Sequence, residues 1–222
     1  MRMGTWIVTG ANRGIGLELA RQLNARGEHV VATCRTASKE LESLGVKVVT
    51  GVDIAQRDSH VPIAEAVKGE RVDVLLHNAG MLVPDSLSSL TAEGLETQYR
   101  VNAVGPLLLT QALLPRLDRG SKIALISSRA GSIGDNGSGG LYGYRMSKAA
   151  LNMAGMSLTR DLASRGILVT VLHPGFVRTT MTGGAGNDDP PVAAKGLLAQ
   201  IDALDADRSG RFFHANGEEL PW

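Results

Sequence analysis

Short apolar segments alternate with segments of helical periodicity along almost the whole chain. The apolar segments are rich in β-branched residues and several end at glycine, a pattern typical of buried strands. They cover residues 5–10, 29–34, 46–54, 72–80, 122–128 and 167–175, with a shorter seventh at 210–217. Helical spacing of apolar residues predicts helices over 14–27, 59–68, 91–117, 144–165 and 192–204.

Strands that are continuously apolar and alternate with helices predict a parallel sheet covered by helices on both faces. The 222 residues suit a single core, and no linker or internal repeat divides them. We therefore predict one α/β domain over residues 1–222, with a doubly wound, mostly parallel seven-stranded sheet.

The composition is ordinary for a globular protein, with 43% apolar residues, 20% charged residues and a net charge of +1. Bulk charge therefore favours neither a nucleic acid nor a membrane as a partner, and no apolar run approaches the length of a membrane-spanning helix. The single cysteine, Cys34, excludes an internal disulfide and fits the cytoplasm. The histidines show no metal-ligand spacing, so no metal is expected.

The turn TGANRGIG joins the first predicted strand to the first predicted helix. Its glycines permit a tight turn, close approach to a pyrophosphate and close packing of the helix on the sheet. The helix N-terminus then presents free N–H groups to that pyrophosphate. The turn alone is weak evidence, but its place between a strand and a helix predicts a Rossmann dinucleotide site built from Gly10, Asn12, Arg13, Gly14, Ile15 and Gly16.

The end of the second strand bears on which dinucleotide is bound. A carboxylate there usually holds a ribose with two free hydroxyls, but this chain has Arg35 instead, and Arg13 lies nearby in the glycine turn. Two guanidinium groups suit the extra phosphate of NADP(H). The alternative is that both arginines are simply solvated. We expect NADP(H), with NAD(H) second.

Two tyrosines precede Lys148 in the stretch YGYRMSKAALN. Tyr144 lies four residues before the lysine, so both side chains share one helical face, whereas Tyr142 lies six residues before it. A nearby ammonium favours a phenolate and would lower the tyrosine pKa from about 10 toward the working pH. The alternative for an isolated pair is packing on a helix surface.

Six motifs in this chain together resemble the classical short-chain dehydrogenase/reductase family. They are TGANRGIG (9–16), HNAG (77–80), VNAVGP (101–106), ISS (126–128), YGYRMSKAALN (142–152) and HPGFVRTTM (173–181). Their order and spacing are those of the family and cover nearly the whole chain. The stretch between residues 127 and 153 and the ending GEELPW resemble the C-factor-like subgroup, which is close to small carbonyl reductases.

The resemblance implies a catalytic tetrad of Asn102, Ser128, Tyr144 and Lys148. Tyr144 would exchange a proton with the substrate oxygen, Ser128 would orient that oxygen, and Lys148 would tune the tyrosine and hold the nicotinamide ribose. The backbone of Asn102 would hold a water that relays protons, although a satisfied buried amide is the plainer interpretation. Ser127 competes with Ser128. The gap between Ser128 and Tyr144 is longer than usual, and residues 137–140 would absorb the extra length.

The resemblance also implies further cofactor contacts. Asn78, Ala79 and Gly80 would line the adenosine ribose, and Asp53 and Ile54 would flank the adenine, although Asp53 could merely end a strand. The nicotinamide carboxamide would meet Pro174, Gly175, Val177 and Thr179. His173 is expected to be structural rather than a catalytic base.

These features predict hydride transfer between NADP(H) and a small carbonyl or alcohol substrate, with reduction favoured. A non-enzymatic NADP(H)-binding or signalling protein is the alternative, since the C-factor-like subgroup is named for signalling. An epimerase, a dehydratase and a redox sensor built on Cys34 are less favoured. Residues 183–191 form either a lid or a plain surface loop. The resemblance also implies a homodimer or homotetramer that pairs the helices 91–117 and 144–165.

Overall fold

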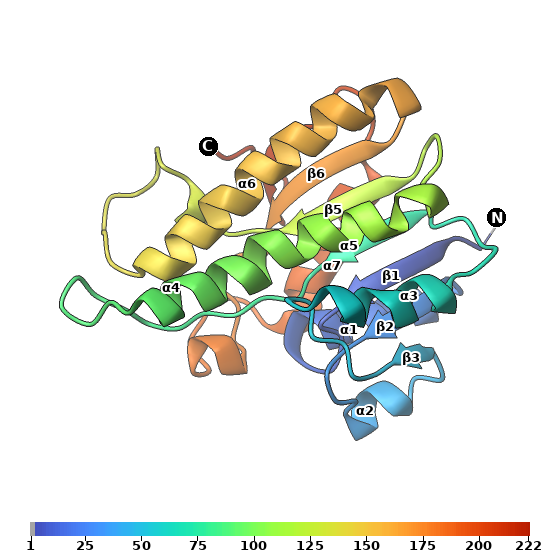
Figure 1. The fold of residues 1–222 in the computed structure, drawn as a ribbon, viewed down its shortest axis with the longest axis horizontal. Helices are drawn as coiled ribbons and strands as arrows, with labels where there is room; N and C mark the ends of the chain where they lie inside the picture. Colours follow the sequence, from blue (N-terminus) through green and yellow to red (C-terminus); the bar gives the residue numbers. More distant parts are fainter. Residues whose placement is uncertain (1–2) are drawn as a thin grey trace.

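Seven strands form one twisted sheet at the centre of the molecule (Figure 1). The computed structural model describes residues 3–222. The strands are β1 (Thr5–Thr9), β2 (His29–Thr33), β3 (Lys47–Val49), β4 (Val74–His77), β5 (Lys122–Ile126), β6 (Leu168–His173) and β7 (Phe212–His214). They lie in the order β3-β2-β1-β4-β5-β6-β7, and every one of these pairs is parallel. The predicted doubly wound seven-stranded sheet is confirmed.

Helices cover both faces of the sheet (Figure 1). They are α1 (Gly14–Ala25), α2 (Lys39–Glu42), α3 (Val61–Ala66), α4 (Ala92–Tyr99), α5 (Gly105–Leu113), α6 (Tyr142–Leu162) and α7 (Pro190–Asp202). Shorter helical turns are η1 (Arg57–His60), η2 (Arg100–Val104), η3 (Leu114–Arg116), η4 (Arg129–Gly131), η5 (Ala163–Arg165) and η6 (Thr180–Thr182).

The strands send alternate side chains to two separate apolar layers, because successive residues of a strand point to opposite faces. Trp6 and Val8 of β1 join α1, α2 and α7 in one layer. Ile7 of the same strand joins α3, α5 and α6 in the other. Each fully buried aliphatic side chain contributes about 1.5–3 kcal/mol, so both layers stabilise the packing of the helices on the sheet.

The predicted helix over residues 91–117 is present as α4, η2, α5 and η3 in succession, and η2 is a π-helical turn. The second long helix, α6, begins at Tyr142, two residues before the predicted start. Strands β3 and β4 are shorter than predicted, and α2 was not predicted. Its four residues, capped by the Ser38 hydroxyl, carry too short a pattern to reveal a helix.

The segment before α7 is tied to the chain ahead of it. Main-chain bonds join Arg178 N–H to the carbonyl of Asp188 and Asn187 N–H to the carbonyl of Phe176. The guanidinium of Arg178 also donates to the carboxylate of Asp189 at 2.8 Å and to the Asn187 carbonyl at 3.0 Å. These contacts join residues 187–189 to residues 176–178, and both interpretations of residues 183–191 stay predictions.

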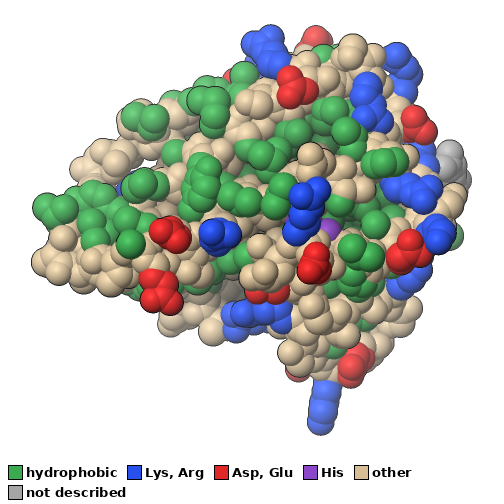
Figure 2. Space-filling model, viewed as in Figure 1, with side chains coloured by type: hydrophobic (Ala, Val, Ile, Leu, Met, Phe, Trp, Pro, Cys, Tyr) green, Lys and Arg blue, Asp and Glu red, His purple; other side chains and the backbone are tan. Residues whose placement is uncertain are grey.

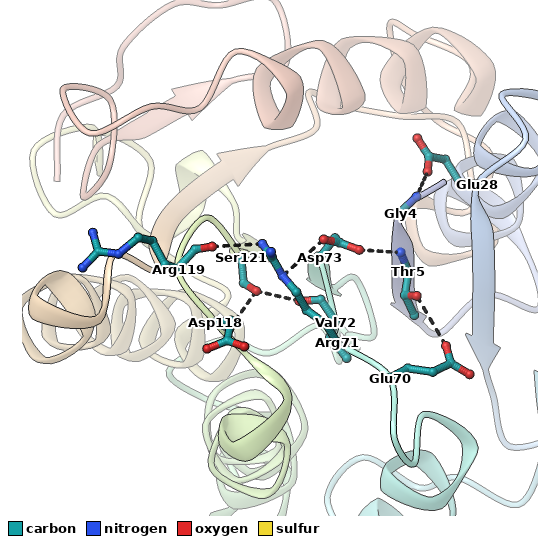
Figure 3. A network of polar contacts seen from close by, with 10 residues as sticks. All are labelled: Gly4, Thr5, Glu28, Glu70, Arg71, Val72, Asp73, Asp118, Arg119 and Ser121. Carbon is teal, nitrogen blue, oxygen red and sulfur yellow. Dashed lines mark hydrogen bonds and ion pairs between the residues drawn. The ribbon is translucent and has the colours of Figure 1, made fainter. Parts of the chain in front are cut away.

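A polar network closes the edge of the sheet at the amino ends of its strands (Figure 3). The carboxylate of Asp73 accepts the N–H of Thr5 at 2.9 Å and pairs with Arg71 at 3.4 Å. Arg71 also donates to the carbonyl of Arg119 at 3.0 Å, and the buried Ser121 hydroxyl donates to the Val72 carbonyl at 2.7 Å. The network ties β1, β4 and β5 together at the edge opposite their carboxyl ends.

Candidate active site

A cleft opens at the carboxyl ends of the central strands, where β1 and β4 lie side by side. The sheet grows outward from this point in two directions: β2 and β3 follow on the far side of β1, and β5, β6 and β7 follow on the far side of β4. The strand order therefore reverses between β1 and β4. The loops that leave the sheet at such a point diverge and create a crevice for a ligand. The cleft holds about 280 Å³. Its position is the one predicted for a dinucleotide.

Most of the residues predicted to contact a cofactor line this cleft: Gly10, Asn12, Arg13, Gly14, Ile15, Gly16, Arg35, Ile54, Asn78, Ala79, Gly80, Tyr144, Lys148, Pro174 and Thr179. The predicted residues Asp53, Gly175 and Val177 are not part of the lining. The sequence analysis missed other lining residues, namely Thr9, Thr33, Cys34, Val52, Met81, Val101, Ile126, Thr180 and Met181. Most of these directly flank a predicted motif residue, so the motifs already marked their neighbourhood.

The glycine turn is shaped by close approaches of backbone to backbone. Gly10 has φ +66°, and a Cβ there would lie 2.9 Å from Cα of Ala79. A Cβ on Gly16 would lie 2.2 Å from the carbonyl oxygen of Gly10, so only glycine lets α1 pack this close to the turn. Arg13, at the N-cap of α1, provides no side-chain cap. The first N–H groups of α1 therefore face the cleft as donors, which fits a pyrophosphate.

Two cations line the far end of the cleft. Arg13 and Arg35 both belong to its walls, and within residues 3–222 neither forms an ion pair. Their guanidinium groups are thus free to engage an anionic ligand. This donor set fits the extra phosphate of NADP(H).

The structure favours the plainer interpretation of Asp53. Its carboxylate accepts the N–H of Ala55 at 3.1 Å, and its own N–H donates to the Ser59 hydroxyl at 3.3 Å. These bonds build the turn between β3 and η1. Its neighbour Ile54 lines the cleft instead, so the apolar side chain is the one placed to meet an adenine ring.

The loop after β4 is held by β1. The Thr9 hydroxyl accepts the N–H groups of Asn78 and Ala79, each at 3.0 Å, and the Asn78 amide donates to the Thr9 carbonyl at 2.9 Å. These three bonds hold Asn78, Ala79 and Gly80 against the glycine turn. Their place beside the turn agrees with the predicted role, and the structure adds Thr9 as the residue that fixes them.

Lys148 is buried at the centre of the cleft. It is 4% exposed, and its Nζ donates to the carbonyl of Ile126 at 2.8 Å. Burial lowers the pKa of this ammonium to about 8, because a charge that leaves water loses its solvation. The lysine still carries its charge at neutral pH, one turn below Tyr144 on the same face of α6, with Nζ 5.7 Å from the centre of the tyrosine ring.

The pKa of Tyr144 moves in the direction opposite to the one expected. Burial raises it, and a hydrogen bond with the Ser128 hydroxyl opposes the rise. The expected net lowering of this pKa is therefore wrong for the arrangement seen here. Loss of solvation around the phenol is the largest cause of the shift, and the Lys148 ammonium is directed to the Ile126 carbonyl.

The two candidate serines have different surroundings. The Ser127 hydroxyl is buried and donates to the side-chain oxygen of Asn152 at 2.5 Å, so it is occupied in holding β5 to α6. The Ser128 hydroxyl accepts the N–H of Ala130 at 3.1 Å and interacts with the phenol of Tyr144. Ser127 and not Ser128 belongs to the lining of the cleft, but the hydrogen bond with the phenol favours Ser128 as the serine that would share a substrate oxygen with the tyrosine.

The long connection between Ser128 and Tyr144 is fixed by Arg145. Its guanidinium donates to the carbonyls of Gly140 at 3.0 Å and Ala130 at 3.2 Å, and to the Ser138 hydroxyl at 2.8 Å. At Gly131 a Cβ would lie 2.7 Å from Cβ of Lys148. The arginine next to the tyrosine thus holds this loop against α6, and the role of residues 137–140 in absorbing extra length stays a prediction.

Asn102 lies in the π-helical turn η2 and is fully buried. Its amide accepts the N–H of Met81 and donates to the Met81 carbonyl, each at 2.8 Å, and donates to the Ser147 hydroxyl at 2.9 Å. The side chain is thus a satisfied buried amide, the plainer of the two interpretations. π-Helical turns leave irregular backbone polar groups and often mark functional sites, so the backbone role stays a prediction.

The segment after β6 contributes only part of what was predicted. Pro174 and Thr179 line the cleft, whereas Val177 is 3% exposed and forms a bridge with Asp188. The ring of His173 packs edge-on against His214 at 5.0 Å. Burial, followed by neighbouring positive groups, lowers the pKa of His173 to about 3. A neutral, packed ring agrees with a structural role.

Metal sites and membrane spans are both absent from the part of the chain that the structure describes. No three His, Cys, Asp or Glu side chains gather there in a way that could bind a metal ion. None of the helices in residues 3–222 has both the length and the apolar character of a membrane span.

Known proteins resemble this chain over nearly its full length. Residues 5–190 match the family model for short chain dehydrogenases. The 1-hydroxy-2-glutathionyl-2-methyl-3-butene dehydrogenase of Rhodococcus sp. (strain AD45) is 40% identical over 226 aligned positions, covering 99% of this chain and all of that protein. The C-signal protein of Myxococcus xanthus is 43% identical over 154 positions, covering 68% of this chain and 93% of its own.

A solved structure gives the same picture in three dimensions. The NADPH-bound carbonyl reductase from chicken fatty liver superposes with a TM-score of 0.89 at 30% identity, covering both chains completely. The match to the family model runs from β1 to the start of α7. This part of the chain contains the glycine turn, the Tyr144–Lys148 pair and six of the seven strands. This chain belongs to the short-chain dehydrogenase family.

Proposed function

We propose that this protein is an NADP(H)-dependent oxidoreductase that reduces a carbonyl group of a small molecule. The observation that carries the proposal is the arrangement around Tyr144. This tyrosine lines the cleft together with the buried, charged Lys148, and its phenol is hydrogen-bonded to the Ser128 hydroxyl. Structural packing alone does not account for a buried ammonium without a carboxylate partner, since burying it costs stability.

The cofactor, when bound, supplies the hydride. Tyr144 would donate a proton to the carbonyl oxygen, and Ser128 would orient the same oxygen through its hydroxyl. Lys148 places a positive charge below the phenol and stabilises the tyrosinate that proton donation leaves behind. Binding in the cleft fixes the two reactants against each other, which removes much of the entropic barrier.

The protonation state of Tyr144 suits reduction. A tyrosine has an ordinary pKa near 10 and burial raises the pKa of this one, so the phenol holds its proton at neutral pH and can donate it. Oxidation of an alcohol would instead need the tyrosinate as a base. The name of the Rhodococcus relative describes a dehydrogenase acting on an alcohol, so the alcohol direction is the one to measure alongside.

Arg13 and Arg35 support NADP(H) over NAD(H). Both line the cleft, and the described chain offers them no carboxylate. A phosphate on the adenosine ribose would give them a bidentate partner. The carbonyl reductase from chicken fatty liver is described with NADPH bound, which agrees with this choice.

Apolar side chains on α5 and α6 support self-association. Leu107 is 43%, Met146 59% and Met153 68% exposed, and Figure 2 shows hydrophobic side chains gathered over these helices. We propose a homodimer or homotetramer in which this face is covered by a second copy. Light scattering on the wild type and on Met153→Glu tests this, and a monomeric wild type would refute it.

A signalling protein without catalysis is the second candidate, because the C-signal protein covers two thirds of this chain at 43% identity. One experiment separates the two. Aldehydes, ketones and quinones are each mixed with NADPH or NADH, and the nicotinamide absorbance is followed. We expect NADPH oxidation by the wild type, and Tyr144→Phe should abolish it while NADPH still binds. Full activity in Tyr144→Phe would refute the assignment, and an inactive wild type would favour signalling.

A further inference from the structure

The helix that carries Tyr144 begins in an unusual way. Its N-cap residue, Leu141, has φ +50° and ψ +44°, and it is the one non-glycine residue with positive φ in the described chain. A side chain in this left-handed region is strained, and leucine has no oxygen with which to cap the helix. The first N–H groups of α6 therefore need acceptors from elsewhere in the chain.

Asp85, from the loop between β4 and α4, supplies these acceptors. Its carboxylate accepts the N–H of Tyr142 and, at 2.9 Å, the N–H of Gly143. Its main-chain carbonyl accepts the N–H of Leu141 at 3.3 Å. A carboxylate at this end also meets the positive end of the helix dipole. One residue, 57 positions before Tyr142, thus does the work of a local cap.

The loop that carries Asp85 is itself fixed by two buried amides. Asn102 binds both the N–H and the carbonyl of Met81, and the fully buried Gln98 accepts the N–H of Val83 at 3.0 Å. At Gly143 a Cβ would lie 2.3 Å from the amide nitrogen of Gln98. Directly before Tyr144, the first turn of α6 is therefore hydrogen-bonded to Asp85 and packed closely against Gln98.

We infer that Asp85 is a positioning residue for the reaction. By holding the amides of residues 141–143, it fixes the first turn of α6 and so the phenol of Tyr144 relative to Ser128. Lys148 does not depend on it, because the Ile126 carbonyl already holds its Nζ. The inference rests on the proposed function, since it takes Tyr144 as the proton donor.

The test compares Asp85→Ala and Asp85→Asn with Thr91→Ala. Thr91 is the matched control because its hydroxyl caps α4, at 3.1 Å from the Gly94 nitrogen, and does not bond the first amides of α6. We expect Asp85→Ala to lower kcat by roughly tenfold or more, since small displacements of reacting groups are costly, and to leave the Kd for NADPH within about twofold of the wild-type value. Asp85→Asn keeps an acceptor oxygen and should lose less, and Thr91→Ala should keep wild-type kcat.

A second measurement does not need turnover. Amide hydrogen exchange in Asp85→Ala should be faster in the first turn of α6 and unchanged from Lys148 onward. Wild-type kcat, wild-type exchange in that turn, or an equal loss of kcat in Thr91→Ala would each overturn the inference. A wild type that fails to oxidise NADPH with every carbonyl compound tested would instead refute the proposed function. The exchange result would still decide whether Asp85 holds the turn. Asp85→Asn serves if the alanine variant does not fold.

Discussion

Replacing Lys148 by methionine should show that the buried ammonium lowers the free energy of unfolding. The folded chain holds the lysine pKa at about 8, against an ordinary value of 10.5. This gap corresponds to about 3 kcal/mol of stability lost at neutral pH, because each pKa unit is worth about 1.36 kcal/mol. Methionine keeps the length and the apolar stem of the side chain but removes the charge.

The sign of the effect follows from the two protonation states. Between pH 8 and 10.5 the unfolded chain keeps its lysine protonated while the folded chain has released that proton, so the free energy of unfolding rises with pH in this window. Below pH 8 both states are protonated and the cost is constant. From pH 7 to pH 10 the wild type should therefore gain about 2.5 kcal/mol relative to Lys148→Met.

Urea unfolding of both proteins at several pH values between 7 and 10 measures this difference, because all other titrating groups cancel in the comparison. Lys195→Met is the matched control, since this lysine is exposed on α7 and its ammonium stays in water. A difference between wild type and Lys148→Met that stays constant with pH would show that burial does not penalise the ammonium. The same variant should lack turnover, so the fold would gain stability by losing its activity.

Further substitutions test the cofactor site and the core. Arg35→Ala should weaken NADPH binding by roughly tenfold or more, because one charged hydrogen bond to a phosphate is worth about 1.5–3 kcal/mol. Fluorescence titration should show little change in NADH binding. An equal loss of affinity for both cofactors would contradict the phosphate role. His77 is 1% exposed, its ring nitrogen bonds the Thr110 hydroxyl at 2.9 Å, and burial lowers its pKa to about 3. The unfolded chain takes up this proton below about pH 6.5 and the folded chain does not, so the free energy of unfolding falls as the pH is lowered through that window. His77→Gln should therefore lose about 2 kcal/mol less than the wild type between pH 7 and pH 5, and parallel curves would contradict this.

The sequence predicted well whatever depends on local spacing. The glycine turn and the Tyr144–Lys148 face are short motifs whose geometry follows from a strand, a turn and a helix, and both lie in the cleft as expected. The doubly wound, parallel sheet also followed, since continuously apolar strands that alternate with helices permit few other arrangements.

Burial and long-range contacts could not be predicted in this way. Reasoning from the pair alone gave the wrong direction for the Tyr144 pKa, because the loss of solvation depends on everything packed around the phenol. Asp53 suited an adenine contact by position, yet its carboxylate is used in a turn. Asp85 gave no signal at all, since its partner amides lie 57 and 58 positions away.

The network at the amino edge of the sheet has a consequence for how the chain is made. β1 lies at the centre of the sheet, and Thr5 is bound by Asp73, 68 residues later. A ribosome adds about 5–20 residues each second, so the first strand waits several seconds before β4 exists to cover its open side. During that time an apolar strand with unpaired backbone groups is exposed, and we expect this chain to depend on chaperones at synthesis more than its finished fold suggests.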